Sequence, residues 1–265
     1  MAIIGYAVTM LVGITLGLIG GGGSIFTIPV LVYLFAVPAV EATSYSHFLV
    51  GVTAALASVN YFKSKKIHFP SVLYFGIPSV LSVYFSRVIL MPWIPEKFSL
   101  GGIEISKDLS ILLLFSIMMI GASYSMISKC EKCTKDDDDS QIKLNIPLVI
   151  LAGFSVGILT GLVGAGGGFL IIPSLVFFGR LPMKKAIATS LFIIACKSLI
   201  GFGSEIGVMT FNWNLLLSTT ALSVLGMFIG TYLNKFIKGE NLKPAFGWLV
   251  LVMGIFMLVL EIKSL

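Results

Sequence analysis

Two clusters of glycine lie at corresponding places in the chain, within stretches that are otherwise apolar. The first is in GLIGGGGSIFTIP, residues 17–29, and the second is in GLVGAGGGFLIIP, residues 161–173. Glycine allows positive φ and close backbone approach, and the first N–H groups of a helix have no partner within it. Such N–H groups lie at the positive end of the helix dipole and can bind an anion. The two clusters therefore predict an anion site built from backbone.

Hydroxyl side chains follow both clusters. They occur directly after the first cluster and again near the start of the next apolar run in each half, in ATSYS at 42–46 and ATS at 188–190. A single small-residue cluster can also serve helix packing, and buried Ser and Thr often bond to their own helix. Two matching clusters, each followed by a short apolar run and a proline, favour the anion site.

Two ionisable residues occur inside apolar runs, where charge is costly and usually functional. Lys197 in IIACKSLIGF could hold the anion, or it could extend toward the outer surface. His47 in SYSHFLVG could relay a proton or donate to the substrate, or it could serve packing alone. Arg87 and Glu205 are near predicted membrane edges, where we expect them to anchor or pair. The predicted substrate-binding residues are Gly20, Gly21, Gly22, Gly23, Ser24, Thr27, Ser44, Ser46, His47, Gly164, Gly166, Gly167, Gly168, Thr189, Ser190 and Lys197.

The composition is that of a polytopic membrane protein. Of 265 residues, 57% are hydrophobic and 11% charged, and the mean hydropathy is +1.03. The net charge of +6 comes from basic residues in short loops, where they set topology rather than bind nucleic acid. Carboxylates and histidines do not fall in spacings that suit a membrane enzyme or a metal. We expect no enzymatic activity, cofactor or metal; the expected partners are the lipid bilayer and a small anion, and the oligomeric state stays open.

The elements that must position these residues repeat along the chain. A shift of 144 residues aligns 12–86 with 156–230 without a gap, which indicates an internal repeat. Most apolar runs can cross about 30 Å of hydrocarbon, but the second run of each half reaches only about 18 Å, which suits half a crossing. The first half also carries an insertion around PWIPEKFSLGG. The ten runs are Ile3–Ile19, Ser24–Phe35, Thr43–Phe62, Phe69–Leu90, Leu109–Ile127, Ile146–Val163, Gly168–Phe178, Ala186–Phe202, Trp213–Phe236 and Ala245–Ile262.

Basic loops change places between the halves. The loop after the third run is basic in the first half, KSKKIH at 63–68, whereas the loop before the third run is basic in the second half, at 180–185. Under the positive-inside rule, the halves then have opposite orientations. We expect an all-α polytopic protein of the cell (plasma or inner) membrane with two inverted-topology repeats, 1–127 and 144–265. Each has a glycine-broken hairpin plus three transmembrane helices. Both termini are then outside, and the linker 128–143 is cytoplasmic.

The linker is the one long polar stretch, SKCEKCTKDDDDSQIK. Its acidic run is typical of a solvated connector. Cys130 and Cys133 could form a redox pair or bind a metal, but a closed zinc site needs a second pair of ligands. We therefore interpret this segment as a connector and leave the role of the cysteines open.

The paired glycine motifs, the ATS motif and the KSLIGF that follows it resemble those of the TauE/SafE family of sulfite and organosulfonate exporters. The resemblance covers nearly the whole chain. It implies a transporter of small sulfur oxyanions or organic anions such as sulfite, thiosulfate, sulfoacetate or sulfolactate. Lys197 departs from the family pattern, in which a polar uncharged residue, often Asn, precedes the Ser of SxxGF.

Repeat and resemblance together favour a secondary transporter in which a central site is exposed to each side in turn. A membrane potential of about 100 mV drives an anion outward by about 2.3 kcal/mol per charge, so export needs no other coupling. The alternatives are an anion channel of similar architecture and a carrier for organic carboxylates. The exact anion, the direction of transport and any coupling ion stay open.

Overall fold

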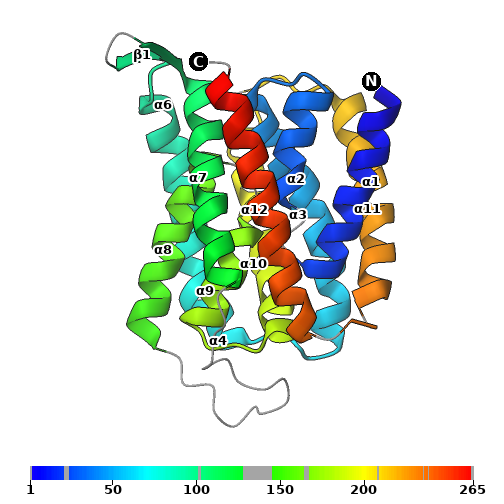
Figure 1. The fold of residues 1–265 in the computed structure, drawn as a ribbon. Coiled ribbons are helices and arrows are strands. Elements are labelled where there is room, and N and C mark those ends of the chain that lie inside the picture. The colour runs from blue at the N-terminus through cyan, green and yellow to red at the C-terminus, as the bar shows by residue number, and fades with distance from the viewer. Residues whose placement is uncertain are drawn as a thin grey trace.

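Helices make up nearly all of the chain in the computed structural model (Figure 1). The structure describes residues 2–20, 24–100, 103–127, 145–163, 167–207, 209–234, 236–237 and 239–263. In the first half the longer helices are α1 (Ala2–Ile19), α3 (Ala39–Lys63) and α7 (Lys107–Ile127), and α5 (Ile77–Phe85) is the middle of a longer helical span. In the second half they are α8 (Ile146–Val163), α10 (Met183–Gly203), α11 (Trp213–Asn234) and α12 (Gly239–Lys263). Within the described residues, six helical stretches are long and apolar enough to span a membrane.

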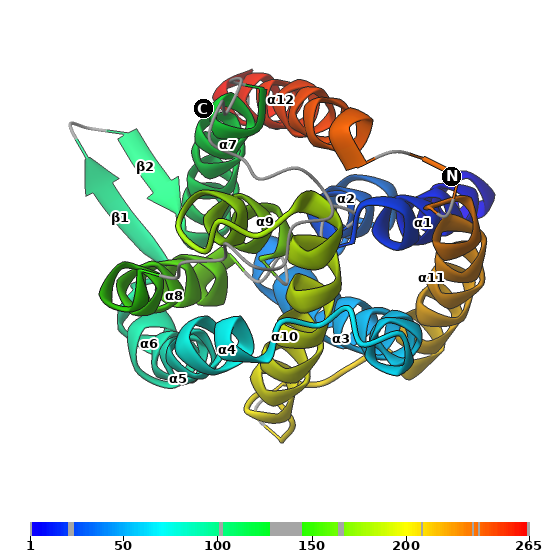
Figure 2. The ribbon, with the colours of Figure 1, turned by 90° about the horizontal axis from the view of Figure 1, so that it is seen from below.

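The second element of each half is short, as predicted. In the first half α2 (Ser24–Pro29) continues into the π-helical segment η2 (Val30–Leu34), and in the second half α9 (Gly168–Phe177) stands alone. Figure 2 shows α2 and α9 in the interior of the bundle, enclosed by the longer helices. These half-length helices can end inside the bundle because protein, rather than lipid, surrounds their ends.

The fourth span of the first half is one continuous stretch, Phe69–Trp93, with two π-helical segments. It comprises α4 (Phe69–Ser71), η3 (Val72–Gly76), α5, η4 (Ser86–Leu90) and α6 (Met91–Trp93). Pro78 and Pro92 follow the two π-helical segments. Because proline has no N–H, the carbonyls four residues earlier, at Tyr74 and Val88, lose their α-helical donors, and the helix widens there.

The insertion of the first half forms a small β-hairpin rather than a helix. Strands β1 (Lys97–Leu100) and β2 (Ile103–Ser106) pair antiparallel, with Lys97 opposite Ser106. Figure 1 shows it at the same end of the molecule as both termini. The expectation of an all-helical chain is therefore correct for the spans, and this extramembrane hairpin is its exception.

The most extensive helix contacts join the two halves. They are α1 with α11, α8 with α5, α7 with α12, and α3 with α10. In Figure 2, α3 and α10 lie near the middle, with the α1–α11 pair on one side and α5–α8 on the other. Exchanging the halves converts the first pair into the second and leaves the other two pairs unchanged, as a twofold axis between the halves would require.

Glycines bring the paired helices into backbone contact. A Cβ built on Gly13 of α1 would lie 2.1 Å from the carbonyl oxygen of Ser223 in α11. A Cβ on Gly157 of α8 would lie 2.5 Å from the carbonyl oxygen of Ser79 in α5. We name these two close helix contacts, α1 with α11 and α8 with α5, the glycine seams. The 144-residue shift relates Gly13 to Gly157 and Ser79 to Ser223, so the two glycine seams are formed by equivalent residues. Close backbone approach of this kind is typical of helix pairing in membranes.

Candidate functional site

Lys197 is buried in the middle of the bundle. Its side chain extends from α10, is 1% exposed, and donates a hydrogen bond of 2.7 Å from Nζ to the Thr160 hydroxyl of α8. A Cβ on Gly167 would lie 2.4 Å from the same Nζ, so the lysine head packs directly against the second glycine cluster. The alternative in which Lys197 extends to the outer surface therefore does not describe this structure.

Gly167 is the N-cap of α9 and adopts a left-handed conformation, with φ of 76°. A side chain there would be strained and would displace the Lys197 head. The N-terminal end of α9 carries the positive end of its dipole. The Lys197 amine thus lies beside the positive end of a helix, and its hydrogen-bond partner Thr160 is neutral.

The first glycine cluster lies against a different part of α10. Gly20 also has a positive φ, 78°, and a Cβ there would lie 2.8 Å from the Ile187 side chain. Ile187 and Lys197 are ten residues apart on α10, so the described glycines Gly20 and Gly167 contact different levels of that helix. Gly21, Gly22, Gly23, Gly164, Gly166 and the side chain of Ser24 lie outside the described residues.

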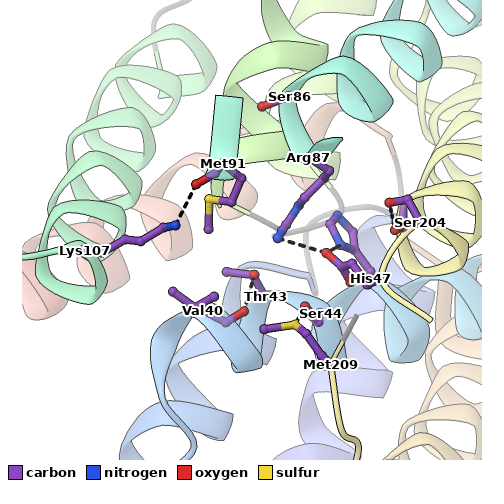
Figure 3. Close-up of polar contacts among 12 residues, drawn as sticks. Val40, Thr43, Ser44, His47, Ser86, Arg87, Met91, Lys107, Ser204 and Met209 are labelled. Carbon is purple, nitrogen blue, oxygen red and sulfur yellow. Dashed lines mark hydrogen bonds and ion pairs between the residues drawn. The ribbon is translucent and has the colours of Figure 1, made fainter. Parts of the chain in front are cut away.

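His47 of α3 belongs to a buried charged cluster at the other end of α10, and Ser44 of the same helix lies beside it (Figure 3). The Arg87 Nη1 atom lies 3.0 Å from Glu205 Oε1, and His47 Nδ1 lies 3.7 Å from the same oxygen. Arg87 is 8% exposed and Glu205 7%. Nε and Nη2 of Arg87 are buried and have no hydrogen-bond partner among the described residues. We name Arg87, Glu205 and His47 the charged cluster.

The charges of this cluster determine the ionisation of Glu205, which follows the last turn of α10. Burial alone raises the pKa of Glu205. The Arg87 guanidinium, and to a smaller extent His47, lower it by more than burial raises it, so the pKa of Glu205 lies below its ordinary value. Glu205 is thus a carboxylate that Arg87 stabilises. Of the two roles expected for Arg87 and Glu205, anchoring or pairing, the structure shows pairing, and the two residues pair with each other.

Lys197 and the charged cluster are linked by the face of α10 that carries Lys197 and Gly201. Gly201 is one helical turn beyond Lys197, and a Cβ on Gly201 would lie 3.5 Å from His47 Nε2. Polar groups therefore follow one another from the centre of the bundle, at Lys197, to its end, at Arg87.

Hydroxyl groups of α3 and α10, which form the third apolar run of each half, hold neighbouring backbone groups. Thr189 accepts a hydrogen bond of 3.0 Å from the backbone N–H of His68, and Tyr45 accepts one of 2.7 Å from the backbone N–H of Asn212. The 144-residue shift relates Tyr45 to Thr189 and His68 to Asn212, so each half holds the corresponding loop of the other. Ser190 donates to the carbonyl of Ile187 in its own helix at 2.9 Å.

Two further predicted site residues are buried without a partner. The hydroxyl oxygens of Thr27 and Ser46 have no hydrogen-bond partner within the described part of the chain. Thr27 lines a cavity of about 10 Å³ between α1, α2 and α11. That volume is at the lower limit for one water molecule, so the cavity could not hold an anion. The structure thus brings Lys197 and Gly167 together, places Ser44 and His47 at the charged cluster, and gives Thr189 and Ser190 hydrogen bonds to a loop and to their own helix.

A basic pocket opens at the end of the bundle opposite the charged cluster. Its volume is about 410 Å³, and it lies between the end of α3, the start of α10 and the end of α11. Ile187, the residue against Gly20, is part of its wall. We name it the lysine vestibule; its lining residues are Asn60, Tyr61, Lys63, Ser64, Lys66, Lys184, Ile187, Thr231 and Asn234.

Sequence reasoning missed Tyr61, Thr231 and Asn234 in this vestibule, because hydroxyl and amide side chains near helix ends carry no distinct signal. The repeat could have pointed to two of them, since the shift relates Tyr61 to Glu205 and Thr231 to Arg87. Within the described residues, no group of three or more His, Cys, Asp or Glu side chains could hold a metal ion.

Residues 5–257 match the family model described as Sulfite exporter TauE/SafE. The chain belongs to the TauE/SafE family. It is 26% identical to a "Probable membrane transporter protein" of Xylella fastidiosa over 94% of this chain and 91% of that protein. It is 27% identical to the "Probable membrane transporter protein YunE" of Bacillus subtilis over 85% of this chain and 86% of that protein. No solved structure matches the chain.

TauE/SafE membership and these relatives make the chain a membrane transporter with several transmembrane helices. The resemblance seen in the glycine, ATS and KSLIGF motifs is confirmed.

Proposed function

We propose that this chain is a carrier of small, sulfur-containing anions, such as sulfite, thiosulfate or an organosulfonate, that works by alternating access. The observation that carries the proposal is Lys197. Its ammonium is buried beside the positive end of α9, and its hydrogen bond goes to the neutral Thr160 hydroxyl. A small anion bound beside this helix N-terminus would favour the protonated form of the Lys197 amine, and the two positive groups together would hold the anion.

The family supports the class of substrate, since the matching model is described as a sulfite exporter. The site geometry supports a small ligand. The Gly167 position leaves no room for a Cβ beside the Lys197 head. Backbone N–H groups, one ammonium and one hydroxyl suit the oxygens of a compact oxyanion. Because Lys197 is buried, a bound anion would be screened little by salt.

The repeat supports alternating access. Helix pairs and glycine seams that exchange with the halves are what two inverted repeats would form. In such a protein, each half can adopt the conformation of the other, which exposes the central site to each side in turn. We place the lysine vestibule on the cytoplasmic side by the positive-inside rule, so that the termini are outside and the linker 128–143 is inside.

The test is flux into proteoliposomes that contain the purified protein and radiolabelled sulfite or thiosulfate. A carrier gives saturable flux that unlabelled anion on the opposite side accelerates. Flux that rises linearly with concentration would indicate a channel, and carboxylate flux without sulfite or thiosulfate flux would overturn the substrate class. No flux of any anion would overturn the proposal.

Lys197→Met tests the site, because methionine keeps much of the length and removes the charge. We expect the KM for sulfite to rise about 10- to 100-fold, since a charge-assisted hydrogen bond contributes about 1.5–3 kcal/mol. Thr53→Val is the matched control: the 144-residue shift relates Thr53 to Lys197, and Thr53 donates to its own helix at the Leu49 carbonyl. Equal KM values in the two variants would remove Lys197 from the site.

A further inference from the structure

The two ends of the bundle differ at positions that the repeat relates. At one end, Tyr61 and Thr231 line the open lysine vestibule. A shift of 144 residues carries Tyr61 to Glu205 and Thr231 to Arg87, which are buried and joined at 3.0 Å. Equivalent positions are thus open at one end and closed by an ion pair at the other.

The correspondence extends to the rest of the vestibule wall. The equivalents of Lys184, Ile187 and Asn60 are Val40, Thr43 and Ser204. Figure 3 shows Val40, Thr43 and Ser204 around the charged cluster. Thr43 is completely buried, and its hydroxyl donates to the Val40 carbonyl at 2.6 Å. The Thr43 position is therefore closed, whereas the equivalent Ile187 lines the open vestibule.

The chemistry of the charged cluster suits an anion. Arg87 offers Nη1 to the Glu205 carboxylate, whereas its Nε and Nη2 are buried with no hydrogen-bond partner in the part of the chain that the structure describes. A guanidinium binds a carboxylate or another oxyanion with the same N–H groups. The Glu205 carboxylate therefore occupies a place on Arg87 that an oxyanion could take when the two residues separate.

We propose that the charged cluster is the closed gate of the second mouth of the transport path, and that Arg87 is an anion-binding residue of that mouth once Glu205 moves away. This inference rests on the proposed alternating access. The described conformation is then the state that is open through the lysine vestibule. Passage to the other state breaks the Arg87–Glu205 pair and closes the vestibule around Tyr61 and Thr231.

Cysteine accessibility tests the gate without any transported substrate. The background replaces Cys130, Cys133 and Cys196 with serine, and each experiment adds one cysteine: Thr231→Cys in the vestibule, or Thr43→Cys at the closed position that the repeat relates to Ile187 of the vestibule. A membrane-impermeant maleimide is added from each side in turn. We expect Thr231→Cys to react from the vestibule side and Thr43→Cys to react slowly from the opposite side.

Glu205→Gln should open the gate. Removing one partner of a buried ion pair destabilises the state that contains it. We expect the labelling rate of Thr43→Cys to rise about tenfold, equivalent to about 1.4 kcal/mol, and that of Thr231→Cys to fall. Arg87→Gln should have the same effect. Glu261→Gln is the matched control, since Glu261 is also 7% exposed but accepts a hydrogen bond from Tyr33 at the edge of the bundle.

Protection by sulfate shows which residue of the ion pair binds an anion. Sulfate suits this test because it does not react with maleimide. It should slow labelling of Thr43→Cys in the Glu205→Gln variant, which retains Arg87, and should have no effect in Arg87→Gln. Gluconate at the same ionic strength controls for screening. Equal protection in both variants would overturn the role of Arg87 in anion binding.

The gate is overturned if Thr43→Cys reacts as fast as Thr231→Cys in the native background. It is also overturned if neither ion-pair variant changes the labelling of Thr43→Cys while Thr231→Cys still reacts. These outcomes are separable from failure of the proposed function. Saturable sulfite flux with unchanged accessibility would leave the carrier and remove the gate. If the ion-pair variants speed labelling of Thr43→Cys and slow that of Thr231→Cys, but no anion is transported, the gate stands and the proposed substrate class is overturned.

Discussion

Two glycine seams allow a quantitative test of how the halves pack. Gly13→Ala places a methyl group 2.1 Å from the Ser223 carbonyl oxygen, and Gly157→Ala places one 2.5 Å from that of Ser79. A carbon–oxygen contact needs about 3.3 Å, so the helices must separate by roughly 1 Å. Both obstacles are backbone atoms, which cannot rotate away. The cost should be about 3 kcal/mol, the upper end of the usual range for overpacking.

The assay is thermal unfolding of the purified protein in detergent, followed by size-exclusion chromatography. About 3 kcal/mol corresponds to a Tm lower by roughly 6 to 12 °C for a chain of this size. Gly121→Ala in α7 is the matched control, since its Cβ meets nothing within 4 Å. Alanine there should leave Tm unchanged or raise it slightly, because it favours the helix by up to about 1 kcal/mol. The reasoning fails if Gly13→Ala and Gly157→Ala both melt with the Gly121→Ala control.

Three further predictions concern the vestibule, the loops and the charged cluster. Replacing all three of Lys63, Lys66 and Lys184 by glutamine should raise the KM for an anion added on the vestibule side several-fold. The increase should be smaller at high salt, because salt screens exposed charges. Lys65→Gln, which lies outside the pocket, is the control. Tyr45→Phe should lower the free energy of unfolding by about 1 kcal/mol, because the hydrogen bond from the Asn212 N–H is lost. Thr189→Val should have a similar effect, because it removes the hydrogen bond from the His68 N–H. Unchanged Tm values would show that other contacts hold the two loops. Because the pKa of Glu205 is depressed, its stabilising effect is present above its unfolded pKa of about 4.3 and is lost as pH falls through the folded pKa. The Tm difference between native protein and Glu205→Gln should therefore shrink below about pH 4, and a difference that stays constant with pH would contradict this.

The sequence predicts the fold well because its strongest signals are local. Apolar runs determine the spans, and glycine followed by a short run determines the half-length α2 and α9. The β-hairpin at 97–106 also has a local signal, which sequence reasoning missed: KFSL and IEIS each alternate apolar and polar residues, on either side of GG. The π-helical segments depend on Pro78 and Pro92, but a proline alone does not specify how a helix adjusts.

The site is predicted less completely because it depends on which helices meet. Lys197 stands out as a charge within an apolar run, and the structure gives it a buried partner. Thr189 and Ser190 carry the same hydroxyls as a binding site would, yet they contact a loop and their own helix. The Arg87–Glu205 pair joins residues far apart in sequence. Only the three-dimensional arrangement shows that their repeat equivalents line an open pocket.

The pairing of α1 with α11 has a consequence for biosynthesis. Residues 2–19 leave the ribosome long before their glycine-matched neighbour, which begins only at Trp213. At about 5–20 residues per second, translation of the intervening chain takes roughly 10 to 40 s. During that time the newly inserted N-terminal segment must wait in the bilayer with an unfilled seam. Mature tertiary structure is therefore a late, post-insertion event, and two separately synthesised halves of the polypeptide should be able to reassemble in one membrane.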